Sequence, residues 1–328
     1  MGVLALQTHP TMEFRPLGRS GLQVSPLAFG CNVFGWTIDE ATSHRLLDAW
    51  VDAGMNFIDT ADVYSRWKPG HVGGESETVI GRWFAQGGRR DKVILATKVG
   101  KDMGDGRVGL HPKYIRQAVD ASLTRLRTDY IDLYQSHDDD TGVPVEDVMG
   151  AFDDLVRAGK VRAVGASNYP ADRLKLALDT SERLGLVRYE SLQPLFNLHE
   201  REPYESALQA LCVEREVGVI NFYALAAGFL TGKYRSEADA HKSARGAGVV
   251  KKYLDARGHR ILAALDAVSA RVDARPGQVA LAWQIAQPGI SAPIASATSL
   301  DQLKELVGAA GLRLDAAARA ELDAASAY

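Results

Sequence analysis

Short apolar runs alternate with longer segments of helical periodicity along almost the whole chain. Eight of these runs predict buried strands, at residues 26–30, 56–59, 93–98, 131–137, 161–167, 189–193, 219–223 and 290–296. Because the runs and the helical segments alternate, the pattern predicts parallel strands that are each covered by a helix.

The segments between the runs carry signals of helix starts. Asp39 is a residue type that caps helix N-termini, and Pro112 fits the first turn of a helix. Apolar residues recur at helical spacing in four segments, at residues 46–51, 115–126, 145–156 and 261–272. These segments predict amphipathic helices that pack on the strands.

Eight strand–helix units predict a closed (β/α)8 TIM barrel, and an open doubly wound sheet is the alternative. The sequence GDGRVG at residues 104–109 matches the glycine pattern of nucleotide-binding open sheets. That pattern requires its first glycine at the end of a strand and a helix that opens within it. Here residues 100–102 intervene and Pro112 opens the helix only later. We therefore interpret residues 104–109 as a mobile loop and expect the barrel.

Both ends of the chain add to this barrel. A turn at residues 18–21 between two extended pieces predicts an N-terminal β-hairpin at residues 14–24. Helical segments near the end predict extra C-terminal helices. Met12 restarts a plausible sequence, so we expect residues 1–11 to be a disordered tail and residues 12–328 to form a single barrel domain.

The composition is that of an average globular protein, with 46% apolar and 24% charged residues and a formal net charge of −3. It argues against disorder and against nucleic-acid binding through excess positive charge. The longest nearly uncharged apolar run, at residues 217–230, is too short to span a bilayer, and residues 1–11 do not resemble a signal peptide. Two cysteines, Cys31 and Cys212, fit a reducing compartment. We expect a cytoplasmic protein without a membrane or nucleic-acid partner, and the sequence leaves its oligomeric state open.

Three consecutive predicted strands end in ionisable residues. These residues are Asp59, Lys98 and His137, and Tyr64 lies in the loop just after Asp59. In a (β/α)8 barrel the C-terminal ends of the strands surround one mouth, where active sites lie. We therefore expect the four side chains to form one site.

These residue types suit proton donation to a carbonyl oxygen while a hydride reaches the carbonyl carbon. A phenol with a pKa of about 10 is a weak acid at neutral pH. A cation at ~4 Å contributes about 4 kcal/mol at an effective dielectric constant of ~20, or up to about three pKa units. Lys98 is expected to bring the pKa of Tyr64 toward a useful range, with Asp59 keeping the lysine charged. His137 can donate a hydrogen bond to the substrate oxygen as negative charge builds there.

Motifs at these positions resemble the aldo-keto reductase family, in the branch that includes potassium-channel β-subunits. They are NFIDTADVY at residues 56–64, ATK at 96–98, DYIDLYQSH at 129–137, GASN at 165–168 and GFLTGKY at 228–234. The resemblance implies a (β/α)8 barrel that binds NADP(H) without a separate nucleotide-binding domain. It also implies that Tyr64 is the general acid, that Lys98 and Asp59 tune it, and that His137 orients the carbonyl group.

The same resemblance implies a set of cofactor-binding residues. Ser167, Asn168 and Gln193 are expected to hold the nicotinamide carboxamide, and Tyr223 is expected to stack on the nicotinamide ring. The other implied cofactor contacts are Cys31, Asn32, Ala224, Leu225, Ala226, Gly228, Leu230, Lys233, Ser296, Thr298, Gln302 and Glu305.

Departures from the family pattern affect the expected cofactor preference. Ser299 and Gln302 form a capping-box pattern, so a helix whose N-terminus attracts phosphate begins after the eighth strand. Family members often carry a basic residue near position 298, where this chain has Thr298, and often have serine where Ala224 and Ala227 stand. NADP(H) is the favoured cofactor, and the missing cation leaves NAD(H) open.

The substrate pocket is expected to have an aromatic wall. Phe34, Trp36 and Trp67 would suit an aldehyde or ketone with a hydrophobic or ring-shaped body, or would simply pack the loops onto the barrel. Residues 236–258 are expected to be either a lid over the cofactor or a solvated insertion.

Two other functions stay open from the sequence. A metal-dependent hydrolase would use His137 with the run of aspartates at residues 138–140, but only one histidine ends a predicted strand. A cofactor-holding partner subunit, as in the potassium-channel β-subunits, shares the same barrel and signature. The favoured function is reversible, NAD(P)H-dependent reduction of a small-molecule aldehyde or ketone, without a metal.

Overall fold

The computed structural model describes residues 13–243 and 245–328. The expected tail at residues 1–11 lies outside these residues.

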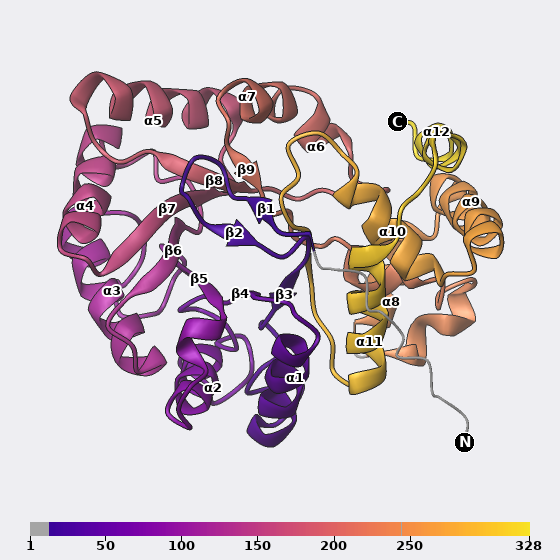
Figure 1. Ribbon diagram of the computed structural model, residues 1–328, viewed down its shortest axis with the longest axis horizontal. Helices are drawn as coiled ribbons and strands as arrows, with labels where there is room; N and C mark the ends of the chain where they lie inside the picture. The colour runs from indigo at the N-terminus through magenta and orange to yellow at the C-terminus, as the bar shows by residue number, and fades with distance from the viewer. Residues whose placement is uncertain (1–12, 244) are drawn as a thin grey trace, which may run out of the picture.

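Eight parallel strands form one curled sheet, with helices on its outer side (Figure 1). In the order of the sheet, the strands are β10 (Ile294–Ala295), β3 (Ala28–Gly30), β4 (Phe57–Asp59), β5 (Ile94–Val99), β6 (Ile131–Ser136), β7 (Val161–Ser167), β8 (Tyr189–Gln193) and β9 (Gly218–Val219). All eight lie within or beside the predicted runs, and every neighbouring pair is parallel. The predicted (β/α)8 architecture is confirmed.

The sheet closes between its last two strands through a loosely paired segment. Val219 and Ile290 form an isolated parallel bridge, and the Val219 carbonyl accepts from the Ser291 amide at 2.8 Å. The Ile294 amide donates to the Asn221 carbonyl, also at 2.8 Å. β9 and β10 contain two residues each and are much shorter than the predicted runs at 219–223 and 290–296. Other residues of these two runs close the barrel through the isolated contacts.

The predicted hairpin closes one end of the barrel. Its strands, β1 (Arg15–Pro16) and β2 (Gln23–Val24), pair antiparallel. Leu17 and Val24 are fully buried in a cluster with interior residues of the barrel strands, including Phe57. Since Phe57 begins β4, the hairpin covers the N-terminal ends of the strands and leaves the opposite mouth free.

The predicted helix starts are also confirmed. Asp39 accepts a hydrogen bond from the Thr42 amide at the start of α1, and Pro112 is at the first turn of α3. The helices after the first strands are α1 (Glu40–Asp52), α2 (Glu75–Phe84), α3 (Pro112–Leu126), α4 (Val145–Arg157), α5 (Ala171–Leu184), α6 (Glu202–Glu205) and α7 (Leu208–Glu214), with the 3-10 turn η1 (Arg90–Lys92) before β5. Residues 104–109 form a loop that ends before α3, as predicted.

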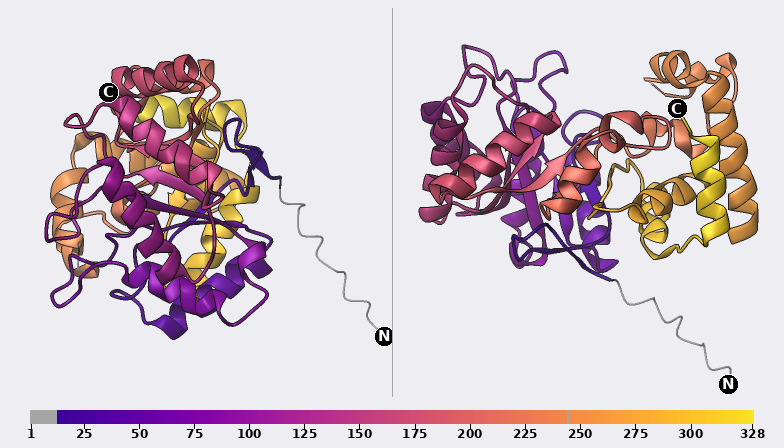
Figure 2. Two further views of the ribbon diagram at one scale, coloured as in Figure 1. Left: turned by 90° about the vertical axis from the view of Figure 1, so that its left-hand side faces the viewer. Right: turned by 90° about the horizontal axis from the view of Figure 1, so that it is seen from above.

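The C-terminal part adds helices beyond the barrel, as predicted. It contains η2 (Ala226–Thr231), η3 (Glu237–Lys242), α8 (Gly246–Tyr253), α9 (Ala256–Val272), α10 (Pro276–Ile285), α11 (Leu300–Gly311) and α12 (Ala316–Ala325). α9 and α12 lie side by side at one end of the molecule (Figure 2). Within the described residues, every helix is too short or too polar to cross a bilayer.

Candidate active site

A large cavity opens at the mouth formed by the C-terminal ends of the strands. Its volume is about 1350 Å³, which exceeds the ~300–1,000 Å³ of most small-molecule pockets. The predicted site residues that line it are Asn32, Trp36, Asp59, Tyr64, Trp67, His137, Ser167, Asn168, Gln193, Tyr223, Ala224, Leu225, Gly228, Lys233, Ser296, Thr298, Gln302 and Glu305. The structure therefore brings most of the predicted site together.

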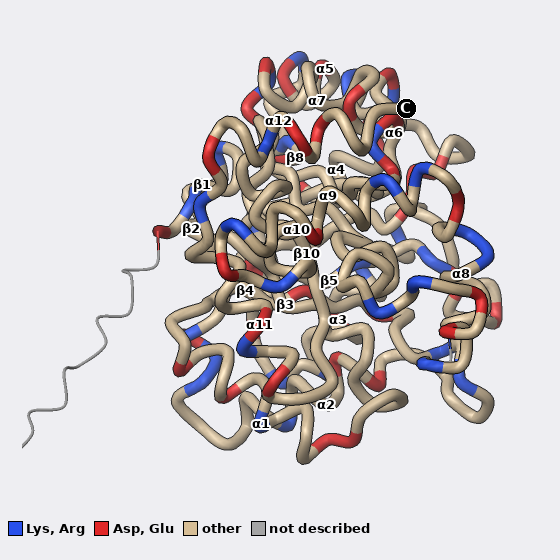
Figure 3. The backbone as a smooth tube through the Cα atoms, turned by 90° about the vertical axis from the view of Figure 1, so that its right-hand side faces the viewer, with Lys and Arg blue, Asp and Glu red and all other residues tan. Residues whose placement is uncertain are grey.

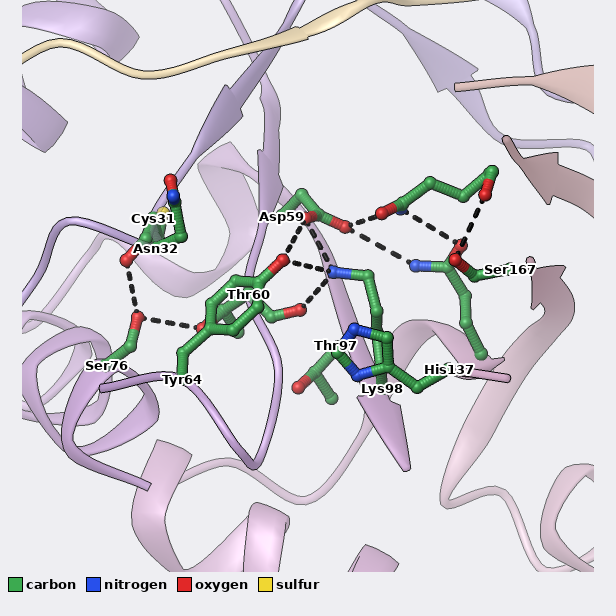
Figure 4. A network of polar contacts seen from close by, with 12 residues as sticks. Cys31, Asn32, Asp59, Thr60, Tyr64, Ser76, Thr97, Lys98, His137 and Ser167 are labelled. Atoms are coloured by element: carbon green, nitrogen blue, oxygen red, sulfur yellow. Dashed lines mark hydrogen bonds and ion pairs between the residues drawn. The ribbon is translucent and has the colours of Figure 1, made fainter. Parts of the chain in front are cut away.

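Lys98 lies beneath the cavity floor and joins Asp59 to Tyr64 (Figure 4). Its ammonium donates to Asp59 Oδ2 at 2.7 Å and to the Tyr64 hydroxyl at 2.9 Å. A third bond of 2.7 Å runs to the main-chain carbonyl of Thr60. All three hydrogens of the ammonium therefore have acceptors, and the side chain is fully buried.

Side chains on β6 and β8 hold the Asp59 carboxylate from its other side. Gln193 Nε2 donates to Asp59 Oδ1 at 3.0 Å, and Gln135 Nε2 donates to the same oxygen at 3.4 Å. Gln135 was not predicted, although it stands two residues before His137 on β6. Because alternate residues of a strand face the same side, the alternation Leu133, Gln135, His137 could have identified it.

Burial decides the acidity of the phenol. It raises the pKa of Tyr64 to about 12, and the nearby Lys98 charge, which lowers this pKa, does not offset it. Lys98 was expected to lower the pKa of Tyr64 toward a useful range, and its charge does lower this pKa, but burial has the larger effect and the net pKa is raised. Burial works against the charge of Lys98 too, but the Asp59 carboxylate and Tyr64 together raise the pKa of the lysine above its usual value. The lysine therefore stays charged next to the phenol.

His137 is an uncharged imidazole at the edge of the same cavity. Burial, followed by the charges of Lys98 and Lys101, holds the pKa of His137 well below its usual value. Its ring centroid lies 6.1 Å from that of Tyr64. Within the described residues, its buried Nδ1 has no hydrogen-bond partner. A neutral ring beside the phenol can donate one hydrogen bond to a bound oxygen.

Three predicted residues at the ends of β7 and β8 present polar groups beside this centre. The Asn168 side-chain amide donates to the His137 carbonyl at 2.9 Å and to Asp138 Oδ1 at 3.0 Å. The Ser167 hydroxyl donates to the Gln193 carbonyl at 3.0 Å. The side-chain amide nitrogen of Asn168 is used by its two bonds, and that of Gln193 donates to Asp59 and Gln135. The amide oxygens of both side chains are therefore left to accept hydrogen bonds from a bound ligand.

A strained loop carries Tyr223 next to these groups. Tyr223, Ala226 and Ala227 have φ values of 53°, 47° and 54°, a left-handed conformation that costs energy in residues with a Cβ atom. Buried amides hold this loop: Asn197 donates to the Tyr223 carbonyl at 3.0 Å, and Gln284 donates to the Ala224 carbonyl at 2.8 Å. The bend leaves the Tyr223 ring 48% exposed at the cavity.

The far end of the cavity meets the N-terminus of α11. Ser299 caps this helix by accepting from the Gln302 amide at 3.3 Å, as predicted. The Gln302 side chain differs from a standard capping box, because it accepts from the amide and the hydroxyl of Thr298, at 2.8 and 3.1 Å. Thr298 and Gln302 thereby border the cavity together.

Two of the three predicted aromatic residues form a wall of the cavity. The Trp36 and Trp67 rings meet edge-on with centroids 5.5 Å apart, and Trp67 lies 5.9 Å from Tyr64. Phe34 is not part of this wall. Its ring is fully buried and packs against Phe29 with centroids 5.7 Å apart, because the turn after β3 directs the side chain into the core.

Three predicted cofactor contacts also lie off the cavity surface. Cys31, Ala226 and Leu230 are fully buried and do not line it. Burial raises the pKa of the Cys31 thiol well above its usual value. The bend of the Tyr223 loop turns Ala226 and Leu230 inward and leaves Gly228 at the surface.

The segment at 236–258 borders the cavity through Lys242, Ser243 and Arg245. The Arg245 guanidinium lies 5.3 Å from the Trp36 ring, so the segment reaches across to the loop after β3. The sequence analysis did not predict that four cations would line the cavity, namely Lys101, Lys242, Arg245 and Arg275. Their positions depend on loop paths and helix packing, which no local pattern encodes.

The aspartates at residues 138–140 do not form a ligand set. Asp139 binds Arg173 at 2.7 and 3.0 Å, Asp140 accepts from the Leu110 amide at 2.8 Å, and Asp138 pairs with Lys101. Among residues 13–243 and 245–328, no three His, Cys, Asp or Glu side chains are arranged to hold a metal ion. The hydrolase alternative therefore has no support from the geometry.

Known proteins that are similar in sequence indicate the family of this chain. Residues 26–327 match the sequence model of the Aldo/keto reductase family. The chain is 36% identical over 312 residues to the uncharacterized oxidoreductase YrpG of Bacillus subtilis, covering 93% of each protein. It is 33% identical to the aldo-keto reductase yakc [NADP(+)] of Schizosaccharomyces pombe, over 91% of this chain and 87% of the relative. It is 30% identical to a probable voltage-gated potassium channel subunit beta of Arabidopsis thaliana, over 90% of each. The chain belongs to the aldo/keto reductase family.

Proposed function

We propose that this protein reduces aldehydes or ketones with a nicotinamide dinucleotide, and that Tyr64 is the general acid. The observation that carries the proposal is the 2.9 Å contact between the Lys98 ammonium and the Tyr64 hydroxyl, at the floor of a cavity of about 1350 Å³. The family supports an oxidoreductase, and its members include the NADP(+)-named relative.

The cavity residues fit a nicotinamide dinucleotide. At one end, the free amide oxygens of Asn168 and Gln193 would accept from a carboxamide, and the Tyr223 ring offers a stacking surface. At the other end, the capped N-terminus of α11 with Thr298 would suit a phosphate. A bound cofactor would supply the hydride. We favour NADP(H) over NAD(H), with the reaction reversible.

The proton is supplied by the chain itself. The Tyr64 hydroxyl would give its proton to the carbonyl oxygen, which becomes an alcohol oxygen as the hydride reaches carbon. The resulting phenolate would accept a hydrogen bond from Lys98, and its charge would be balanced by the ammonium. His137, which stays neutral, would donate to the carbonyl oxygen and orient it.

The surroundings explain why a phenol with a raised pKa can serve as the acid. The Tyr64 proton is held in the resting protein, because burial disfavours the free phenolate. The carbonyl oxygen becomes strongly basic only as hydride arrives, so proton transfer is favourable at that moment. The buried ammonium then stabilises the phenolate in a site of low dielectric constant.

A screen of aldehydes, ketones and alcohols with NADPH, NADH and their oxidised forms, followed by nicotinamide absorbance, tests the proposal. We expect turnover with at least one carbonyl class and faster turnover with NADPH. A protein without turnover across the panel that co-purifies with a membrane protein would instead act as a partner subunit, the role named for the plant relative. A cytoplasmic location stays a prediction.

A further inference from the structure

The cations that line the cavity belong to different parts of the fold. Lys101 pairs with Asp138, Lys242 pairs with Asp239 at 2.7 Å, Lys233 lies 5.1 Å from the Tyr234 ring, Arg245 lies 5.3 Å from the Trp36 ring, and Arg275 pairs with Glu305. Within the described residues, Arg275 is thus the lining cation that pairs with a residue of α11. α10 and α11 lie together on the side of the molecule shown in Figure 3, where basic and acidic positions are mixed.

Arg275 is fixed at its main chain, and its guanidinium pairs with Glu305 while staying exposed. It is the N-cap residue of α10, and its amide donates to Gln278 Oε1 at 2.9 Å. Gln278 Nε2 donates in turn to the Glu305 carbonyl at 3.2 Å, which ties the start of α10 to α11. The Arg275 side chain is nevertheless 70% exposed. The guanidinium therefore stands at a defined place and can still bind a ligand from the cavity.

Among the described residues, α11 and the segment before it bring no cation to the cavity. Residues 294–306 contain one basic residue, Lys304. Its side chain is 80% exposed, approaches Asp301 at 4.0 Å and does not line the cavity. Thr298 and Gln302, which do line it, are uncharged. Arg275 instead reaches the cavity from α10, more than twenty residues before position 298, and pairs there with Glu305.

We propose that Arg275 recognises the 2′-phosphate of NADP(H) and sets the preference over NAD(H). The inference rests on the proposed function, because it requires a nicotinamide dinucleotide in this cavity. A guanidinium binds phosphate through paired N–H donors, and its five donors allow it to contact Glu305 and a phosphate together. NAD(H) has a hydroxyl at that position, and Arg275 would then stay paired with Glu305 alone.

The test is the binding of NADPH and of NADH to the intact protein, measured by nucleotide fluorescence without substrate and checked by ligand-induced shifts in unfolding temperature. In Arg275→Met the ratio of the NADH to the NADPH dissociation constant should fall about tenfold to a hundredfold, as for the loss of a charged hydrogen-bonding partner. Arg275→Lys, which keeps the charge but not the paired donors, should give an intermediate ratio. NADPH binding should also become less sensitive to salt in Arg275→Met.

Arg271→Met is the matched control, because Arg271 forms an exposed pair with Glu321 at 2.6 Å outside the cavity. The ratio of the NADH to the NADPH dissociation constant in Arg271→Met should equal that of the wild type. The inference is overturned if the wild type binds both nucleotides equally, or if Arg275→Met weakens both by the same factor. Either result leaves the proposed function standing. A wild type that binds neither nucleotide would overturn the proposed function together with this inference.

Discussion

Replacing Lys98 with methionine removes one charge from the floor of the site and keeps the length of the side chain. The ammonium donates to Asp59, Tyr64 and the Thr60 carbonyl at 2.7–2.9 Å, and it is fully buried. In Lys98→Met the Tyr64 phenolate would form without a cation beside it, next to the Asp59 carboxylate, whose charge raises the pKa of Tyr64.

The distance between the Lys98 ammonium and the Tyr64 oxygen sets the size of the effect. Two unit charges 2.9 Å apart interact by about 6 kcal/mol at an effective dielectric constant of ~20, which corresponds to about four pKa units. Part of this is lost to desolvation, and general acid catalysis itself contributes ~10²–10⁴-fold. We expect kcat/KM to fall about a thousandfold. Stability should fall as well, by about 3–5 kcal/mol, because a buried carboxylate loses its partner.

A double variant separates these two effects. Asp59→Asn combined with Lys98→Met removes both buried charges, so denaturant unfolding should show most of the lost stability restored. Its kcat/KM, measured with saturating cofactor, should stay as low as that of Lys98→Met. If activity returned together with stability, or if Lys98→Met kept kcat/KM within tenfold of the wild type, Lys98 would serve only to neutralise Asp59.

Three further side chains give separate predictions. Burial, together with the nearby Glu77 charge, raises the pKa of Asp62 from 3.8 to about 8. The folded protein therefore keeps Asp62 protonated at pH values where the unfolded chain has already lost this proton. The free energy of unfolding is not affected below about pH 4, and it decreases as the pH rises to about 8. Asp62→Asn should therefore nearly match the wild type in urea unfolding at pH 4 and exceed it by up to about 6 kcal/mol above pH 8. A pH-independent difference would contradict this. Since the pKa of His137 is well below its usual value, the imidazole should not titrate by NMR between pH 6 and 8, and a titration there would show that it charges. Trp67→Ala should raise KM for aromatic aldehydes about threefold to tenfold and leave small aliphatic aldehydes unaffected; equal changes for both would remove Trp67 from the substrate wall.

The sequence predicts the barrel and the floor of the site because both depend on strand ends. Each run of apolar residues stops at the same rim, so Asp59, Lys98 and His137 had to meet once the barrel closed. The helix starts at Asp39 and Pro112 could also be predicted, because they follow from local hydrogen-bonding and φ preferences.

Other features depend on packing that the sequence does not display. Phe34 turns into the core because of a single turn after β3, and the same local sequence could have placed it at the mouth. Arg275 reaches the cavity only because α10 packs on α11. The pKa of Tyr64 depends on how deeply the phenol is buried, which outweighs the nearby charge that the sequence did predict.

The measurement that tests the central claim most directly compares turnover and cofactor binding in Tyr64→Phe. This variant removes one oxygen and keeps the ring that contacts Trp67 and His137. Tyr130→Phe is the control, because the Tyr130 hydroxyl contacts Asp91 outside this cavity. We predict that Tyr64→Phe lowers kcat at least about a hundredfold, with NADPH affinity within twofold of the wild type, and that Tyr130→Phe leaves both unchanged. If Tyr64→Phe turned over carbonyl substrates at the rate of the wild type, Tyr64 would not be the proton donor.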